Sequence, residues 1–148
     1  MPTIDNNKEL IRAIEMSREC PLSAGAFSVG ALIFNSEGVE VGCGFSRETG
    51  LAVHAEEVAL DRAIAQGANL SNGTLVSSLE PCGKRLSGRE SCADKIIKSG
   101  IRSVVYAMKE PSVFVERTGD TKLRKAGISI TAVESLSPLV KDVIGNIL

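Results

Sequence analysis

The 148-residue sequence has no tryptophan, a single histidine, little excess of either charge and no long apolar run. No apolar stretch approaches the roughly 18 residues that a membrane span requires. The polar start at residues 1–8 does not resemble a secretory signal, and we therefore expect a cytoplasmic protein without membrane contact. The near balance of 17 basic and 18 acidic residues argues against a general nucleic-acid-binding surface and favours a small-molecule substrate.

The sequence also contains no internal repeat, linker or low-complexity segment, and its length suits one domain over residues 1–148. Four cysteines, Cys20, Cys43, Cys82 and Cys92, are scattered through a chain that we expect to meet reducing conditions. Metal binding or burial is therefore favoured over a disulfide framework.

Hydrophobic periodicity predicts strands that alternate with short helices along most of the chain. The predicted helices cover residues 8–20, 54–66, 92–99, 119–126 and 137–148, and the predicted strands cover residues 26–34, 39–45, 74–79, 101–108 and 128–133. The first two strands form a hairpin, whereas strands separated by helices require crossovers and parallel pairing. These elements indicate an α/β fold with three layers, α/β/α, around a five-stranded mixed sheet.

The only histidine, His54, opens an HAE motif, and Cys82 and Cys92 follow it in the sequence. One imidazole and two thiolates give three ligands, whereas structural zinc sites usually have four, so the donor set favours a catalytic Zn2+ with a position left for water. Such an ion lowers the pKa of its water from 15.7 to about 7. Both cysteines are expected where a helix begins, and a helix N-terminus favours the thiolate form that binds metal.

A structural zinc site is the alternative, with Cys43 or Cys20 as its fourth ligand. Cys43, however, lies between Gly42 and Gly44 in a predicted strand. That pattern is typical of a small core residue or of a close approach of two backbones.

Two adjacent glutamates compete for the role of proton carrier beside the metal. Each residue advances a helix by about 100°, which places Glu56 with Ala59 and Ile64 on the apolar face and Glu57 with Asp61 on the polar face. An inward carboxylate is costly unless it is paired or functional. The helix phase therefore favours Glu56 as the catalytic residue.

Between Lys84 and Arg102 the sequence has six basic and two acidic residues, although the net charge of the chain is −1. Lys84, Arg85 and Arg89 lie between the two cysteine ligands. Because arginine is shaped for bidentate phosphate contacts, we expect these three residues to face an anionic group of the substrate. A solvated basic loop is the alternative.

The order of the HAE motif, Pro81-Cys82 and Cys92 resembles the cytidine deaminase superfamily. Within it, the chain looks most like the pyrimidine deaminase of the riboflavin pathway. The likeness extends from about residue 29 to residue 130, and it is carried by VGA at 29–31, GCGF at 42–45, LEPC at 79–82, GR at 88–89, CADKIIKSGI at 92–101 and LRKAGI at 123–128.

The resemblance implies a cytidine-deaminase-like fold, a homo-oligomer (dimer or tetramer) and a zinc-dependent hydrolytic deaminase. Its substrate would be an amino-pyrimidine ring of a nucleotide or nucleoside-like molecule, such as a ribosylamino-pyrimidine phosphate. By matching residues, it implies His54, Cys82 and Cys92 as zinc ligands and Glu56 as the proton carrier. Regions that line the pocket in related deaminases add the substrate-contact candidates Phe27, Ser28, Ser46 and Ala55.

The sequence departs from the riboflavin-pathway enzymes in three places. GAFS at residues 25–28 replaces a longer loop, Ser46 stands where a histidine is usual, and the loop between Cys82 and Cys92 is longer. A cytidine or deoxycytidine nucleoside deaminase is therefore an alternative, and a tRNA-editing adenosine deaminase is disfavoured by the net charge. A non-catalytic, zinc-stabilised interaction module is the alternative of a different class.

Overall fold

The computed structural model describes residues 4–21, 23, 27–85, 90–109, 115–116 and 119–145. The described helices are α1 (Asn6–Ser17), α2 (Ala55–Ala65), α3 (Cys92–Ser99), α4 (Gly119–Lys125) and α5 (Ser137–Ile144), with a 3-10 turn at Glu134–Leu136. The described strands are β1 (Gly30–Phe34), β2 (Glu40–Phe45), β3 (Thr74–Leu79), β4 (Lys84–Arg85), β5 (Ser103–Met108), β6 (Val115–Glu116) and β7 (Ser129–Ala132).

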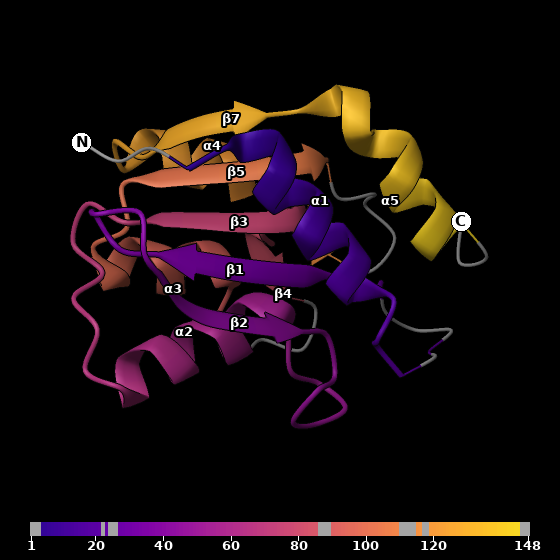
Figure 1. Ribbon diagram of the computed structural model, residues 1–148, viewed down its shortest axis with the longest axis horizontal. Helices are drawn as coiled ribbons and strands as arrows, with labels where there is room; N and C mark the ends of the chain where they lie inside the picture. The colour runs from indigo at the N-terminus through magenta and orange to yellow at the C-terminus, as the bar shows by residue number, and fades with distance from the viewer. Residues whose placement is uncertain are drawn as a thin grey trace.

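Five of these strands form one mixed sheet in the order β2-β1-β3-β5-β7 (Figure 1). β1 pairs antiparallel with β2 and with β3, whereas β3, β5 and β7 pair in parallel. The predicted hairpin, parallel crossovers and five-stranded mixed sheet are therefore confirmed. β4 and β6 form a separate antiparallel pair that periodicity could not predict, because each strand has only two residues.

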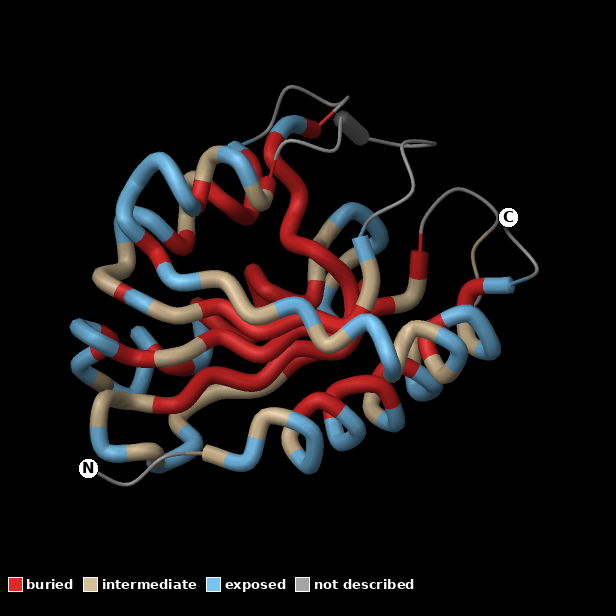
Figure 2. The backbone as a smooth tube through the Cα atoms, turned by 90° about the horizontal axis from the view of Figure 1, so that it is seen from above, coloured by how far each residue is buried: buried red, intermediate tan, exposed pale blue. Residues whose placement is uncertain are grey.

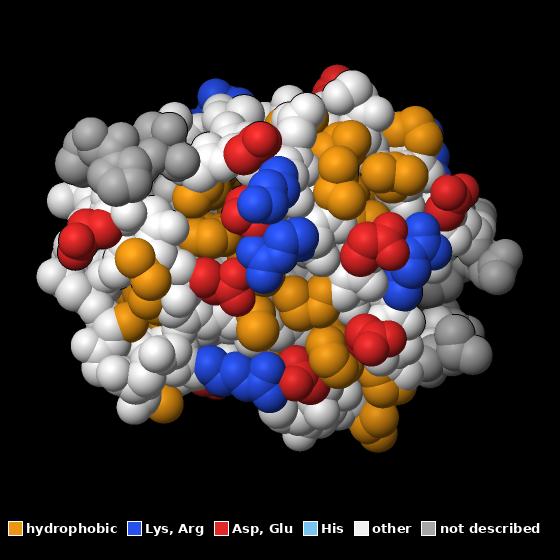
Figure 3. All heavy atoms as spheres, in the orientation of Figure 1, with side chains coloured by type: hydrophobic (Ala, Val, Ile, Leu, Met, Phe, Trp, Pro, Cys, Tyr) orange, Lys and Arg blue, Asp and Glu red, His pale blue; other side chains and the backbone are white. Residues whose placement is uncertain are grey.

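Helices cover both faces of the sheet, which confirms the three-layer α/β/α arrangement. α1 and α5 lie on one face, and α2, α3 and α4 lie on the other (Figures 1 and 2). α1 turns one buried stripe toward β1 and β3, made of Leu10, Ala13, Ile14 and Ser17. On the face that α1 and α5 cover, acidic and basic side chains are interspersed (Figure 3). Within the described ranges, no helix combines the length and apolar character needed to cross a membrane.

Gly42 and Gly44 allow α2 to lie close against β2. A Cβ atom at Gly42 would come within 2.4 Å of the carbonyl oxygen of Ala59, and one at Gly44 within 2.6 Å of the Val58 side chain. A side chain at either position would push the helix off the sheet, because interiors are close-packed. The interpretation of Cys43 as a residue at a close backbone approach is therefore confirmed.

Three element ends differ most from the prediction. α1 ends at Ser17 rather than at residue 20, β1 begins at Gly30 rather than at residue 26, and α5 ends at Ile144 rather than at residue 148. Residues 26 and 146–148 lie outside the described residues. β1 starts late because the Val29 N–H donates to the side chain of Ser46, at 2.9 Å, instead of to a strand backbone.

Candidate active site

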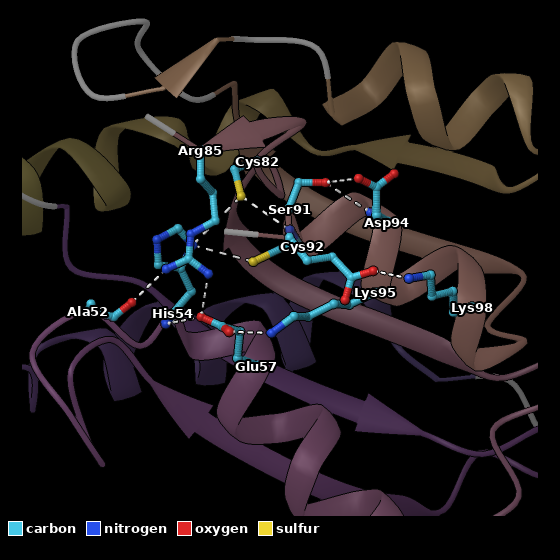
Figure 4. Close-up of polar contacts among 11 residues, drawn as sticks. Ala52, His54, Glu57, Cys82, Arg85, Ser91, Cys92, Asp94, Lys95 and Lys98 are labelled. Carbon is cyan, nitrogen blue, oxygen red and sulfur yellow. Dashed lines mark hydrogen bonds and ion pairs between the residues drawn. The ribbon is translucent and has the colours of Figure 1, made fainter. Parts of the chain in front are cut away.

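The three predicted metal ligands come from three separate segments. His54 is the N-cap of α2, Cys82 lies in the loop after β3, and Cys92 is the first residue of α3. Their side chains point toward one another (Figure 4). The Nδ1 atom of His54 lies 3.3 Å from Cys92 Sγ and 3.7 Å from Cys82 Sγ, and the three donor atoms lie within 4.8 Å of one another.

These separations fit a tetrahedral zinc ion. Zn–S bonds of about 2.3 Å and Zn–N bonds of about 2.0–2.1 Å place sulfur and nitrogen donors about 3.6 Å apart at the tetrahedral angle. Cys20 and Cys43 are both described and free of disulfides, and both lie outside the donor group. The structure therefore gives no support to a four-ligand structural site completed by either cysteine.

The N-terminus of α3 points its first backbone N–H groups toward Cys82. The Cys92 backbone N–H donates to Cys82 Sγ at 3.2 Å, and the Ala93 N–H donates to the Cys82 carbonyl oxygen at 3.0 Å. The prediction that Cys82 itself begins a helix is wrong, because it lies in a loop, but the start of a helix still favours its thiolate. The hydrogen bond between the two thiols lowers the pKa of Cys82, and the same bond together with burial raises the pKa of Cys92.

Glu56 points inward from the first turn of α2, as the helix phase predicted, and it is only 4% exposed. Its Oε2 atom accepts a hydrogen bond from the hydroxyl of Ser77 on β3, at 3.4 Å. Burial raises the pKa of Glu56 to about 7, against a smaller lowering effect of His54. A carboxyl group with this pKa can take up and release a proton near neutral pH, as general acid–base catalysis requires. Ile64, placed on the same face by the phase, is instead 60% exposed, whereas Ala63 beside it is fully buried.

Glu57 is buried, although the helix phase placed it with Asp61 on the polar face of α2. It is 3% exposed, and its carboxylate lies between Arg85 of β4 and Lys95 of α3 (Figure 4). The helix phase gave the direction of the Glu57 side chain correctly, but β4 and α3 cover that side of α2. Burial alone would raise the pKa of Glu57, but hydrogen bonds from the His54 backbone and Lys95, with the charge of Arg85, lower it to about 2.

Phe27 and Ser28, two of the predicted substrate contacts, are tied to the end of β2 by Arg47. The Arg47 guanidinium donates to the carbonyl oxygens of Pro21 and Phe27 and to the hydroxyl of Ser28. Phe27 is buried and Ser28 is partly exposed. This network holds the loop in place, and contact of either residue with a substrate stays a prediction.

The remaining uncharged candidates, Ser46 and Ala55, are both buried. The hydroxyl of Ser46 bonds to the backbone N–H and carbonyl oxygen of Val29. Ala55 is the first residue of α2, next to His54. Their contacts with a substrate also stay predictions.

The basic candidates differ from one another in their surroundings. Lys84 is exposed, whereas Arg85 is buried and donates to the Glu57 carboxylate at 2.8 Å and to the Ala52 carbonyl oxygen at 2.6 Å. The described contacts of Arg85 thus point toward the protein interior. Arg89 lies outside the described residues.

Sequence reasoning missed three residues near the site: Ser77 beneath Glu56, Lys95 beside Glu57, and Arg47. Ser77 had a local signal, because Ser77 and Ser78 are adjacent hydroxyl residues in a buried strand, and a buried hydroxyl needs a partner. The other two had none, since their partners come from distant parts of the chain.

Comparison with known proteins agrees with this geometry. Residues 5–108 match the cytidine and deoxycytidylate deaminase zinc-binding region. The chain is 35% identical over 132 residues to the diaminohydroxyphosphoribosylamino-pyrimidine deaminase of Schizosaccharomyces pombe, covering 88% of this chain and 32% of that protein. It is 34% identical over 123 residues to the protein of the same name from Buchnera aphidicola, covering 82% of this chain and 79% of that protein.

The structure is also similar to that of Aspergillus oryzae Rib2 deaminase in complex with DARIPP, with a TM-score of 0.83 and 25% identity, covering 96% of this chain and 91% of that chain. The chain spans less than a third of the first relative's length, 32%, and 27% of the riboflavin biosynthesis protein RibD of Aquifex aeolicus. The resemblance to riboflavin-pathway pyrimidine deaminases is confirmed by these matches. Since the zinc-binding region is matched over residues 5–108, the chain belongs to the cytidine and deoxycytidylate deaminase family.

Proposed function

We propose that the chain is a zinc-dependent hydrolytic deaminase that replaces the ring amino group of a ribosylamino-pyrimidine phosphate with oxygen. The observation that carries this proposal is the position of Glu56, a buried carboxyl group in the first turn of α2, directly after His54 of the His–Cys–Cys donor group. A proton carrier beside an open three-ligand site is the arrangement that hydrolytic deamination needs.

In the proposed reaction, His54, Cys82 and Cys92 hold a zinc ion, which when bound acidifies a water molecule and so supplies the nucleophile for the amino-bearing ring carbon. The Glu56 carboxylate accepts a proton from this water and donates it to the ring nitrogen. Glu56 then carries the second proton of the water to the amino group, which leaves as ammonia. The hydroxyl of Ser77 orients the Glu56 carboxyl group during both transfers.

The names of the relatives support the substrate class. Two relatives are diaminohydroxyphosphoribosylamino-pyrimidine deaminases, and a similar structure contains DARIPP. The basic segment that begins at Lys84 supports an anionic group on the substrate. Because the described contacts of Arg85 are with Glu57 and Ala52, we assign the anion contacts to Lys84 and Arg89.

The wider organisation is part of the same proposal. The chain length supports one domain, and the net charge of −1 supports a small-molecule substrate and no binding of nucleic acid. The match to the deaminase family supports the homo-oligomer that the resemblance implies. Sedimentation equilibrium would measure the oligomeric state, and a monomer at micromolar concentration would contradict this part.

The test is ammonia release by the zinc-loaded protein from diaminohydroxyphosphoribosylamino-pyrimidine, its dephosphorylated form, cytidine and deoxycytidylate. We expect turnover of the first compound, and loss of at least about a hundredfold in kcat for Glu56→Gln with zinc content unchanged, because general acid–base catalysis contributes roughly 10²–10⁴. Turnover of cytidine or deoxycytidylate alone would overturn the substrate class. Zinc binding without any turnover would favour a non-catalytic zinc module.

A further inference from the structure

We propose that Glu57 is a positioning residue, whose carboxylate holds the three ligand-bearing segments at the separation that the metal requires. Glu57 is not a member of the donor group itself. The inference rests on the proposed metal centre and adds to it a residue that acts through the ligands.

The carboxylate of Glu57 makes one contact to each ligand-bearing segment. Its Oε1 atom accepts from the His54 backbone N–H at 2.9 Å and from the Arg85 guanidinium at 2.8 Å, and its Oε2 atom accepts from the Lys95 ammonium group. Figure 4 shows the carboxylate between these two basic side chains, directly below the ligand cluster.

The spacing of these contacts along the chain explains why they bear on the ligands. Arg85 lies in β4, shortly after Cys82 in the sequence, and Lys95 lies about one helical turn after Cys92 in α3. The first contact is made to the backbone of a ligand, His54. Arg85 also donates to the carbonyl oxygen of Ala52, at 2.6 Å, so it binds the segment just before His54 as well.

Burial makes this arrangement stiff. The side chains of Glu57, Arg85 and Lys95 are 3%, 5% and 28% exposed, so water competes little for their hydrogen bonds. Buried ion pairs add little net stability, because desolvation offsets the attraction. The role proposed for Glu57 is therefore to define one arrangement of its three partners, through the hydrogen bonds that it accepts from them. Residues that orient metal ligands without binding the metal typically change metal affinity when they are replaced.

The test uses Glu57→Gln, which keeps the size of the side chain and removes its charge. Its matched control is Glu48→Gln: Glu48 likewise accepts from a backbone N–H, that of Phe45 at 3.2 Å, and pairs with an arginine, Arg62 at 2.6 Å. Both partners of Glu48 are remote in sequence from the metal ligands, since Phe45 ends β2 and Arg62 lies in the last turn of α2, at the opposite end of the helix from His54. Zinc affinity is measured by competition with a chelator, and the absorption spectrum of the Co2+-loaded protein reports the ligand geometry.

We expect Glu57→Gln to weaken zinc binding roughly 10- to 100-fold and to change the Co2+ spectrum, while Glu48→Gln matches the wild type in both. Lys95→Met should weaken zinc binding as well. The fold loss of zinc affinity in the double variant of Glu57→Gln and Lys95→Met should be smaller than the product of the two single fold losses, because both residues act through one contact. Lys95→Met also supplies the test if Glu57→Gln does not fold.

Two results would overturn the proposal in distinguishable ways. If the wild type binds Zn2+ but Glu57→Gln and Lys95→Met bind it equally well and keep the wild-type Co2+ spectrum, Glu57 has only a structural role. If the wild type binds neither Zn2+ nor Co2+, the metal centre of the proposed function fails together with this inference.

Discussion

Glu56 and Glu57 are neighbours on one helical turn, yet their surroundings move the acidity of their carboxyl groups in opposite directions. Both are almost completely buried. Burial raises the pKa of Glu56 to about 7, whereas Glu57 has cationic and backbone donors that outweigh burial and lower its pKa to about 2. At neutral pH, Glu57 is therefore a fixed anion and Glu56 is a group that can exchange its proton. This difference supports the two proposed roles, proton transfer for Glu56 and positioning for Glu57.

The raised pKa of Glu56 predicts how pH affects the metal-free protein. Below pH 4.5 Glu56 is protonated in both the folded and the unfolded state, and between pH 4.5 and about 7 the unfolded state ionises first, so folding stability falls as pH rises. Glu56→Gln cannot ionise and should avoid this loss. We expect the variant to be more stable than the wild type at pH 8, by up to about 3 kcal/mol, and equally stable at pH 4. Urea unfolding in EDTA at both pH values measures the difference.

The control for this prediction is Glu37→Gln, which changes an exposed carboxylate in a turn. It should leave the difference between pH 4 and pH 8 as in the wild type. A wild type and a Glu56→Gln variant of equal stability at pH 8 would show that Glu56 is not desolvated.

At the scale of elements, the site depends on how closely α2 lies against β2. His54 is the N-cap of α2. The helix packs against Gly42 and Gly44 of β2, where the absence of side chains leaves room for the backbone of Ala59. Gly42→Ala places a Cβ atom 2.4 Å from that carbonyl oxygen. The helix must shift, which should lower the free energy of unfolding by about 1–3 kcal/mol and weaken zinc binding as well.

Cys43→Ala is the control for the glycine variant, since it removes atoms from the next residue instead of adding them beside α2. Urea unfolding and chelator competition measure both effects. Wild-type stability and zinc affinity for Gly42→Ala would mean that α2 can move without disturbing its cap.

For the whole molecule, local patterns were sufficient for the layers, the sheet and the donor group. Helical and strand periodicity gave β3 and α3 with their observed bounds, and the HAE motif with Cys82 and Cys92 gave a cluster that the fold assembles. The burial of Glu57 could not be predicted, because it depends on Arg85 and Lys95, which approach α2 only after the chain has folded. Helix phase states where a side chain points, but not which element will cover it.

Metal removal tests the molecule as a whole, since the donors join α2, the loop after β3 and α3. A ligand that binds only the folded state stabilises it by about 2.7 kcal/mol at a concentration 100 times its Kd. We expect EDTA to lower the Tm of the zinc-loaded wild type, and Cys82→Ser to abolish most of this effect. Cys43→Ser is the matched control. Because Cys43 lies outside the donor group, the Tm of the zinc-loaded Cys43→Ser variant should still fall when EDTA is added. Equal sensitivity of all three proteins would place the zinc elsewhere, and loss of sensitivity in Cys43→Ser would restore the four-ligand structural site.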